Sequence, residues 1–350
     1  MYNLRNQKID FAYHPQYITE EVHNGKLQRS RTEVGDLIMN IVGPPLGKLA
    51  IIPTTLPQAN FNQAAVLIRP YKFKEVLVSY LKVYLEEMSE INSIATRGSA
   101  GQVNISLTQS QNMRIPIPPL NEVRRIIEEV SKYDILIDSL KQNITDIQNL
   151  IAYTKSKILD LAIHGKLVLQ DPNDEPAIEL LKRINPDFTP CDNGHYTQLP
   201  EGWAICKMKQ ITSITNGKSQ KNVETLNGIY PIYGSGGVIG RANQYLCIAG
   251  STIIGRKGTI NNPIFVEEHF WNVDTAFGLK ANDAILDKYL YYFCLSFDFS
   301  KLDKSTAMPS LTKTSIGNVL IPIPPYKEQE RIVAKIDMVL DTMNEILRAV

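Results

Sequence analysis

The sequence predicts a mixed α/β (α+β) fold in which two strand-rich globular domains are joined by long antiparallel coiled-coil helices. Three observations lead to this prediction. The chain has 350 residues, enough for two domains of ordinary size. A five-residue motif occurs twice, 206 residues apart. After each copy, apolar residues recur with the alternating steps of three and four that are typical of a coiled coil.

The internal repeat is clearest at residues 115–119 and 321–325, which both read Ile-Pro-Ile-Pro-Pro. Farther upstream, residues 35–52 and 250–266 each predict a strand, a glycine-rich turn and a second strand. The other matches are predicted helices at 75–90 and 285–296, and Ser-Leu-Thr at 106–108 and 310–312 ahead of a final strand. A repeat of this kind predicts two domains of one fold.

The two domains are predicted at residues 1–119 and 199–325. The second opens with Leu-Pro-Glu-Gly-Trp at residues 199–203 and runs about 50 residues before its glycine-rich turn. The first has only 34 residues before the same point and no comparable opening. We therefore expect the first domain to lack its opening strands.

The first coiled-coil helix is predicted at residues 120–165, with Asn121 as N-cap and Gly165 as C-cap. The second, residues 326–350, stops within its pattern, so we expect it to be incomplete. Only Thr154 interrupts the apolar seam of the first helix. The seam positions are Ile126, Val130, Tyr133, Ile137, Leu140, Ile144, Ile147, Ile151, Ile158 and Leu161, then Ile332, Ile336, Val339, Met343 and Ile346.

A connector of residues 166–198 separates the first coiled-coil helix from the second domain. Residues 170–176 carry turn-forming Asp, Asn and Pro. Residues 177–184 show the spacing of a short amphipathic helix.

The net charge of +1 hides an uneven distribution. Residues 1–119 hold 12 Lys and Arg against 9 Asp and Glu, and residues 199–325 hold the same numbers. Each domain is therefore +3, and the helices with the connector are −5. Two mildly basic domains on an acidic scaffold are compatible with a nucleic-acid partner, which the total charge alone disfavours.

Basic side chains cluster with aromatic and hydroxyl residues in both domains. This composition suits phosphate anchoring with base-edge contacts, although composition alone favours an ordinary solvated surface. Tyr230 and Tyr245 are interleaved with the basic residues of the second domain. The candidate DNA-binding residues are Lys26, Arg29, Arg31 and Lys48 in the first domain, and Lys218, Lys221, Tyr233, Ser235, Arg241, Arg256 and Lys257 in the second.

No motif predicts catalysis or a metal site. The glycine-rich residues 234–240 lack the ending of a phosphate-binding loop, so a tight turn between strands is favoured over a backbone phosphate contact. Pro-Pro-Tyr at residues 324–326 follows an isoleucine that cannot accept a hydrogen bond from an amino group. His269 is interpreted as a packed surface histidine, with ligand contact as the alternative.

The four cysteines, Cys191, Cys206, Cys247 and Cys294, form no C-x-x-C pair. Cys191 precedes His195 by four residues, without a second such pair to complete a zinc site. We therefore expect four free thiols. No uncharged apolar run predicts a membrane span and no secretory signal is visible, so a cytoplasmic location is predicted.

Several of these segments resemble the specificity (S) subunit of type I restriction-modification systems. Residues 199–203 are similar to the start of that family's target-recognition domain, and residues 230–237, Tyr-Pro-Ile-Tyr-Gly-Ser-Gly-Gly, to its recognition-domain turn. Residues 161–168, Leu-Ala-Ile-His-Gly-Lys-Leu-Val, resemble the end of its spacer helix. Pro-Leu-x-Glu from Pro119 and Pro-Tyr-x-Glu-Gln from Pro325 resemble the starts of its helices. The resemblance covers essentially the whole chain.

The resemblance implies a DNA-reading subunit without catalysis of its own. Each target-recognition domain would read half of a bipartite site in double-stranded DNA, and the helices would set the spacing between the halves. The helices would also dock modification (methyltransferase) subunits, and a restriction subunit would complete a complex for DNA methylation and phage defence. S-adenosylmethionine, ATP and Mg²⁺ are expected on those partners, and no cofactor is expected on this chain.

The sequence departs from that family at the opening of the first domain and in the second helix. A truncated chain could be a remnant, a reservoir for recombination, or a subunit that needs a second chain. The alternative to DNA recognition is therefore an inactive S-subunit fragment that acts only as a coiled-coil interaction protein.

Overall fold

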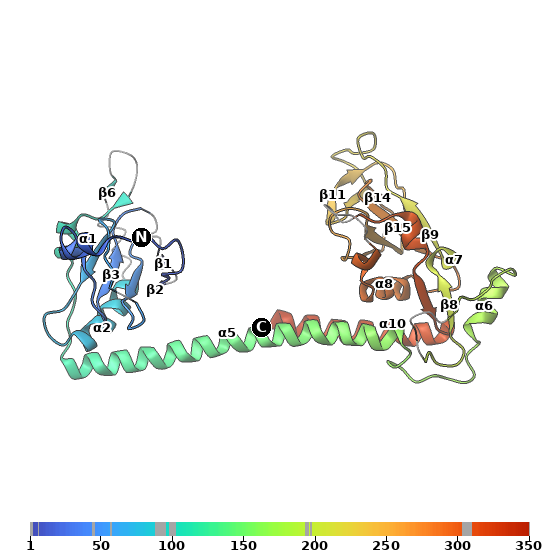
Figure 1. The fold of residues 1–350 in the computed structure, drawn as a ribbon. Coiled ribbons are helices and arrows are strands. Elements are labelled where there is room, and N and C mark those ends of the chain that lie inside the picture. Colours follow the sequence, from blue (N-terminus) through green and yellow to red (C-terminus); the bar gives the residue numbers. More distant parts are fainter. Residues whose placement is uncertain are drawn as a thin grey trace. The chain divides into compact units, whose positions relative to one another are not determined.

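The computed structural model describes residues 3–5, 7–43, 46–56, 58–87, 96–97, 103–192, 196, 198–302 and 310–349. Contacts divide the chain into a first unit, Met1–Lys141, and a second unit, Gln142–Val350. Strands and helices are mixed in both units (Figure 1), in agreement with the predicted fold class.

The first unit is built from short strands and helices. Its elements are β1 (Leu4–Arg5), β2 (Lys8–Ile9), α1 (Glu20–Asn24), the 3-10 helix η1 (Gln28–Ser30), β3 (Leu37–Asn40), β4 (Leu49–Ile51), β5 (Ala65–Ile68), α2 (Lys74–Glu87), β6 (Thr96–Arg97), β7 (Val103–Asn104), α4 (Leu107–Gln111) and the first part of α5 (Leu120–Ile163). Ser106 and Gln109 form a capping box, in which Ser106 Oγ accepts the Gln109 backbone N–H at 3.1 Å. The Ser-Leu-Thr motif of this copy therefore begins α4.

The core of the first unit is a three-stranded antiparallel sheet in the order β4-β3-β5. Side chains of a strand alternate between its two faces. Leu37 and Met39 consequently share one face, where they pack in one cluster with Leu81 and Leu85 of α2.

The other face of this sheet carries a second, smaller cluster around Ile38 and Ala65, which the N-terminal Leu4 joins. A cavity of about 540 Å³ lies over this face. Its lining includes the apolar Ile38 and Ile52 and the polar His23 and Gln58. The N-terminal segment therefore covers this face incompletely.

The second unit holds the rest of α5 and a larger set of strands. Its further elements are α6 (Ala177–Ile184), β8 (Ala204–Lys207), α7 (Met208–Ile211), β9 (Thr212–Asn216), β10 (Tyr230–Gly234), β11 (Gly237–Ala242), β12 (Ser251–Gly255), β13 (Ile264–Val266), β14 (Trp271–Asn272), β15 (Ala276–Ala281), α8 (Asp287–Ser296), the 3-10 helix η2 (Phe299–Leu302), α9 (Lys313–Gly317), β16 (Leu320–Ile323) and α10 (Tyr326–Ala349).

The largest sheet of the second unit has the order β13-β12-β15-β9. Its β13-β12-β15 part is antiparallel and repeats the β4-β3-β5 arrangement of the first unit. A second sheet, β11-β10-β14, combines an antiparallel and a parallel pair. The order of strands therefore confirms the internal repeat.

A tyrosine fixes the proline motif to the neighbouring helix in both units. The Tyr80 hydroxyl of α2 donates to the Pro116 carbonyl at 2.7 Å. The Tyr289 hydroxyl of α8 donates to the Pro322 carbonyl at 2.9 Å. Pro116 and Pro322 occupy the same position of the repeated motif, so the repeat extends to individual hydrogen bonds.

A lysine supports the turn that leads into the central strand of each sheet. Lys74 Nζ donates to the Val34 carbonyl at 2.9 Å, ahead of β3. Lys280 Nζ donates to the Ala249 carbonyl at 3.0 Å, ahead of β12. Both ammonium groups also contact a carboxylate, which compensates part of the cost of removing a charge from water.

The predicted final strand forms only in the second unit. There, β16 pairs with β8, which comes from the segment just after the Leu-Pro-Glu-Gly-Trp opening. The prediction of a matching strand in the first unit is wrong, because residues 114–117 adopt no strand. A strand needs a partner for its backbone groups, and no sequence in the first copy matches the segment that forms β8.

Helix α5 has 44 residues and confirms the predicted long helix. It begins at Leu120, so the prediction of Asn121 as N-cap is wrong, and Asn121 lies inside the first turn. Gly165 follows the helix with a φ of +67°, and the Lys166 backbone N–H donates to the Leu161 carbonyl at 2.8 Å. This is the left-handed ending that favours glycine, as predicted.

Burial along the predicted seam differs between its parts. In the second unit, Ile151 of α5 and Ile332, Ile336 and Met343 of α10 are buried. In the first unit, the α5 positions that follow Val130 are exposed, with Tyr133, Ile137 and Leu140 each between 46% and 59% accessible.

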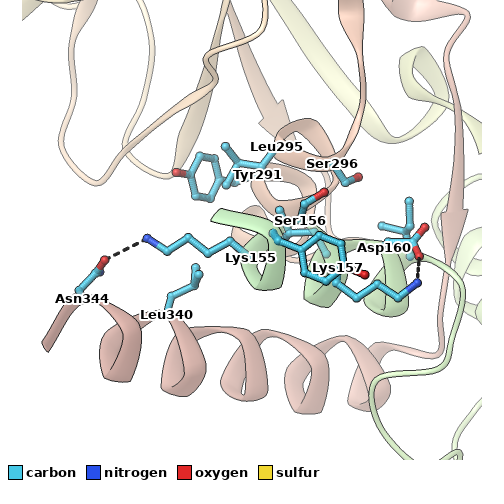
Figure 2. Close-up of a pocket in the computed structure, with 12 residues that line it drawn as sticks. Lys155, Ser156, Lys157, Asp160, Tyr291, Leu295, Ser296, Leu340 and Asn344 are labelled. Carbon is cyan, nitrogen blue, oxygen red and sulfur yellow. Dashed lines mark hydrogen bonds and ion pairs between the residues drawn. The ribbon is translucent and has the colours of Figure 1, made fainter. Parts of the chain in front are cut away.

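Within the second unit, α10 runs antiparallel to the end of α5 (Figure 1), and Lys155 Nζ donates to Asn344 Oδ1 at 3.1 Å. A pocket of about 750 Å³ lies where both helices meet α8 (Figure 2). Tyr291 and Leu295 of α8 and Leu340 of α10 form part of its wall. The second unit is therefore packed directly onto its helices.

The connector confirms the predicted short helix, since α6 spans Ala177–Ile184. Ala177 and Leu181 of α6 are buried in the main core of the unit. Gln170 and Asp174 contact the first turns of α10, through hydrogen bonds to Glu328 at 3.0 Å and from Arg331 at 2.7 Å. The connector therefore ties the start of α10 to the second domain.

Candidate nucleic-acid interface

Residues 271–276 of the second unit form the segment on which several predicted DNA-binding residues converge. The Val273 backbone N–H donates to the Tyr233 carbonyl at 2.9 Å. The Lys218 backbone N–H donates to the Asn272 carbonyl at 3.0 Å, and the Trp271 indole N–H returns a 3.0 Å bond to the Lys218 carbonyl. Strand β10 and the turn after β9 are thereby fixed to one short segment.

Arg256 and Lys257 reach the same segment from the end of β12. Their backbone N–H groups donate to the Thr275 carbonyl at 2.7 and 3.3 Å. The Arg256 guanidinium also donates to the Asp274 carbonyl at 3.4 Å and lies 5.9 Å from the centre of the Phe277 ring. These contacts hold the guanidinium at the surface in a defined position.

Gly217 allows this close approach. A β-carbon at this position would lie 1.8 Å from the Val273 carbonyl oxygen, a distance that no side chain tolerates. The glycine therefore brings Lys218 against residues 271–276, and any side chain at position 217 would push the two segments apart.

Strands β10 and β11 form a hairpin whose turn is Ser235-Gly236. This confirms the prediction of a tight turn between strands. The Tyr233 ring packs edge-on to Phe270 with centroids 5.5 Å apart. Burial and the nearby Glu268 raise the pKa of Tyr233, while Arg241 lowers it; the net shift is upward, so the hydroxyl keeps its proton.

Most of the predicted residues in the second unit reach solvent. Lys218, Lys221, Arg241 and Lys257 are exposed, as a phosphate contact requires. Tyr233, Ser235 and Arg256 are half-buried. Arg241 Nη1 donates to the Ile229 carbonyl at 3.2 Å, so its backbone contact orients the guanidinium at the hairpin.

The predicted residues of the first unit are less closely gathered. Lys26 and Arg29 are exposed around α1 and η1. Arg31 is half-buried, and its guanidinium donates to the His23 carbonyl at 3.2 Å and to Asn24 Oδ1. Lys48 lies just before β4, where its backbone N–H donates to Asn40 Oδ1 at 2.6 Å. Arg31 therefore contacts α1, whereas Lys48 lies in a separate turn.

An aromatic cluster accompanies the basic residues of the second unit. Tyr245 and His269 stack with ring centroids 4.5 Å apart, and Tyr230 lies edge-on to Tyr245 at 5.1 Å. Sequence reasoning placed both tyrosines among the basic residues but favoured a packed surface histidine at position 269. The pairing of Tyr245 with His269 carries no sequence signal, because 24 residues separate them.

Three of the four cysteines are buried, and Cys191 is half-buried. All four thiols are free, as predicted. Burial raises the pKa of Cys247 to about 12, and its thiol donates to Asn272 Oδ1 at 3.1 Å. Within the described residues, no three His, Cys, Asp or Glu side chains gather around one point, and His195 lies outside those residues.

Among the helices that the structure describes, none is both long and apolar enough to cross a lipid bilayer.

Comparison with protein families tests the resemblance found in the sequence. A family model described as "Type I restriction modification DNA specificity domain" matches residues 16–149 and 200–350. The chain belongs to this family. Each matched range contains one copy of the repeated proline motif, and the family assignment confirms the resemblance to type I specificity subunits.

Individual relatives agree with the family assignment. The specificity subunit of the type I restriction enzyme EcoAI from Escherichia coli is 25% identical over 71% of this chain and 57% of its own length. The EcoEI specificity subunit, also from Escherichia coli, is 31% identical over 33% of this chain and 29% of its own length. The chain thus matches little more than half the length of the first relative and less of the second.

A solved structure shares the fold. The crystal structure of the HsdS subunit from Thermoanaerobacter tengcongensis has a TM-score of 0.56 and 19% sequence identity. The match covers 91% of this chain and 76% of that chain. The fold of this chain is therefore one that the HsdS subunit also has.

Proposed function

We propose that this chain recognises a bipartite site in double-stranded DNA, with each unit reading one half of the site in the major groove. The repeated sheet carries the proposal, since β4-β3-β5 and β13-β12-β15 have the same order and the same tyrosine-to-proline hydrogen bond. Two readers of one fold and different surface residues suit a site with two different halves.

Lys218, Arg256 and Lys257 provide the phosphate contacts of the second unit in this proposal. Their backbones meet at residues 271–276, so their side chains leave the surface from one short region. Neutralising phosphates releases counterions, which makes affinity fall with salt concentration. Replacing Lys218 and Lys257 by Glu repels the second unit from DNA of any sequence and flattens the salt dependence by about one unit per lost contact. Because this unit then no longer docks, the complex also loses discrimination in the half-site that the unit reads.

Helix α5 sets the distance between the half-sites in this proposal. Its 44 residues make a rod of about 66 Å, roughly two turns of B-DNA. Deleting residues 134–140 shortens the helix by about 10.5 Å and rotates its end by only about 20°. The required spacer then shrinks by about three base pairs while both half-site sequences stay the same. An unchanged spacer contradicts this role of α5.

The helices also dock the partner subunits in this proposal. Two modification subunits bind S-adenosylmethionine and methylate the DNA that this chain selects, and a restriction subunit with ATP and Mg²⁺ completes the complex in the cytoplasm. Support comes from membership of the type I family and from a relative named as the specificity subunit of a type I restriction enzyme.

The test is methylation-sensitive sequencing of host DNA, with and without this chain, in cells that produce the cognate modification subunits. We expect one bipartite motif to be methylated only when the chain is present. The absence of any chain-dependent motif contradicts the proposal. A salt-titrated binding assay with the assembled complex and bulk competitor DNA provides a second readout that does not depend on methylation.

A further inference from the structure

The aromatic cluster of the second unit exposes a flat surface that the phosphate contacts do not use. The Tyr245 and His269 rings are nearly parallel, with 17° between their planes. Both residues are exposed, and Tyr245 is 47% accessible. The stack restrains the imidazole, so that its outer edge has a defined orientation towards solvent.

A backbone hydrogen bond fixes the tautomer of this imidazole. The Ala249 backbone N–H donates to His269 Nδ1 at 2.9 Å. A backbone N–H can only donate, so Nδ1 carries no proton, and the ring proton resides on Nε2. In the described part of the chain, no hydrogen bond engages Nε2. His269 therefore presents a single oriented N–H donor at the surface.

Base edges in the major groove differ in their response to such a donor. Guanine offers two neighbouring acceptors, N7 and O6, whereas adenine and thymine offer one acceptor each, and cytosine offers only its N4 amino group, which is a donor. A donor held against an amino group leaves both groups without an acceptor in a desolvated interface. A fixed N–H therefore suits guanine best and rejects cytosine most strongly.

We propose that His269, restrained by Ala249 and Tyr245, reads a guanine edge in the half-site bound by the second unit. This inference rests on the proposed function and adds to it one specificity-determining residue with a stated base preference. Ala249 and Tyr245 act as positioning residues, because they hold the ring and do not themselves have to touch the base.

Two substitutions separate the reading role from a structural one. In His269→Asn, the side-chain oxygen replaces Nδ1 and keeps an acceptor for Ala249, but nothing replaces the Nε2 donor. In His269→Gln, the longer side chain places an amide N–H near the position of Nε2. His164→Gln is the matched control. His164 lies just after α5, away from the aromatic cluster, and its imidazole contacts the Asp160 carbonyl at 2.7 Å.

The experiment uses the full chain with its modification subunits and a library of DNA sites randomised at every recognised position. The readout is the ratio of methylation rates for guanine and for cytosine at each position. We expect His269→Asn to reduce this ratio by about five- to hundred-fold at one position of one half-site. His269→Gln retains most of the preference, and His164→Gln retains all of it.

The possible failures are distinguishable. If the wild-type chain methylates a bipartite motif and His269→Asn leaves every position unchanged, the reading role is wrong and the proposed function stands. If His269→Asn and His269→Gln lower methylation of all sites equally, His269 is structural and the inference fails. If the wild-type chain directs no sequence-specific methylation, the proposed function fails and this inference with it.

Discussion

Each unit buries a carboxylate next to hydrogen-bond donors, Asp36 in the first unit and Glu328 in the second, and these two are stabilised differently. In the first unit, Asp36 is fully buried and contacts Arg69 at 2.5 Å and Lys74 at 2.7 Å. In the second unit, Glu328 is equally buried but accepts hydrogen bonds from neutral groups, the Trp203 indole and the Gln170 amide, at 3.1 and 3.0 Å.

The difference appears in the acidity of the two groups. Burial acts to raise the pKa of Asp36, but hydrogen bonds from Arg69, Lys74 and the Glu33 backbone outweigh it, and the pKa is lowered. Burial dominates at Glu328, where the hydrogen bonds from Gln170 and Trp203 compensate only in part, and the pKa is raised. The cost of burying a carboxylate is thus compensated by cations in the first unit and by neutral hydrogen-bond donors in the second.

The largest expected effect is that of Asp36→Ala in the first unit. It leaves two cations without their buried partner, which costs about 2–4 kcal/mol, less than for fully buried ions because Arg69 and Lys74 are partly exposed. The free energy of unfolding by urea measures this loss. Amide hydrogen exchange in β3 and β5 should accelerate as the unit loses stability. A loss of unfolding free energy below about 0.5 kcal/mol would show that the ion cluster is not stabilising.

The corresponding change in the second unit, Glu328→Ala, leaves the Trp203 and Gln170 donors unsatisfied and costs about 2 kcal/mol. Its control is Glu122→Ala, because Glu122 holds the same repeat position at the start of α5 but is exposed. We expect the control to cost less than about 1 kcal/mol, mostly through the helix dipole. Equal costs would mean that the connector does not stabilise α10.

The two carboxylates predict opposite dependences of stability on pH. Asp36 has a lowered pKa in the folded state, so its contribution is present above pH 3.8 and is lost as the pH falls through the folded pKa. Glu328 has a raised pKa, so its contribution is present below pH 4.5 and is lost as the pH rises through the folded pKa.

Unfolding free energies at a series of pH values, compared between the wild-type chain and two variants, test these signs. The advantage of the wild type over Asp36→Asn should shrink on acidification, and its advantage over Glu328→Gln should shrink as the pH rises. The same slope for both pairs contradicts the assignment of cations to one site and neutral donors to the other.

A smaller effect is expected from the contact between α8 and α10. Asp337 accepts bonds from Lys288 Nζ at 2.8 Å and from the Tyr292 hydroxyl, and the equivalent position in α5 is Ser131. Asp337→Ala should cost about 1 kcal/mol, since the ion pair is partly exposed. Ser131→Ala should leave the free energy of unfolding unchanged in the same urea titration. An equal loss of stability in both variants would contradict a stabilising role of the Asp337 contact that is specific to the second unit.

The repeated architecture could be predicted from the sequence because it rests on local patterns. The proline motif marked equivalent points in both units, and heptad spacing predicted α5. The amphipathic residues of Ala177–Ile184 predicted α6 at its observed bounds. Each of these signals lies within a continuous stretch of sequence.

The errors and omissions arise from contacts between distant residues. The final strand of the first unit was predicted from its own sequence, but a strand depends on a partner such as β8. Glu328 meets Trp203 across 125 residues of sequence, and no pattern announces that hydrogen bond. The convergence of Lys218, Tyr233 and Arg256 on residues 271–276 likewise follows only from the strand pairing.

The measurement that most directly tests recognition by two readers is competition binding of the assembled complex to its cognate DNA site. One charge-reversed variant carries Lys26→Glu with Arg29→Glu, and the other carries Lys218→Glu with Lys257→Glu. Competitors scrambled in one half-site or the other report which half each variant still distinguishes. We predict that the first variant loses discrimination in one half and the second variant in the other half. Loss of discrimination in the same half by both variants, or in neither half, would contradict the assignment of one half-site to each unit.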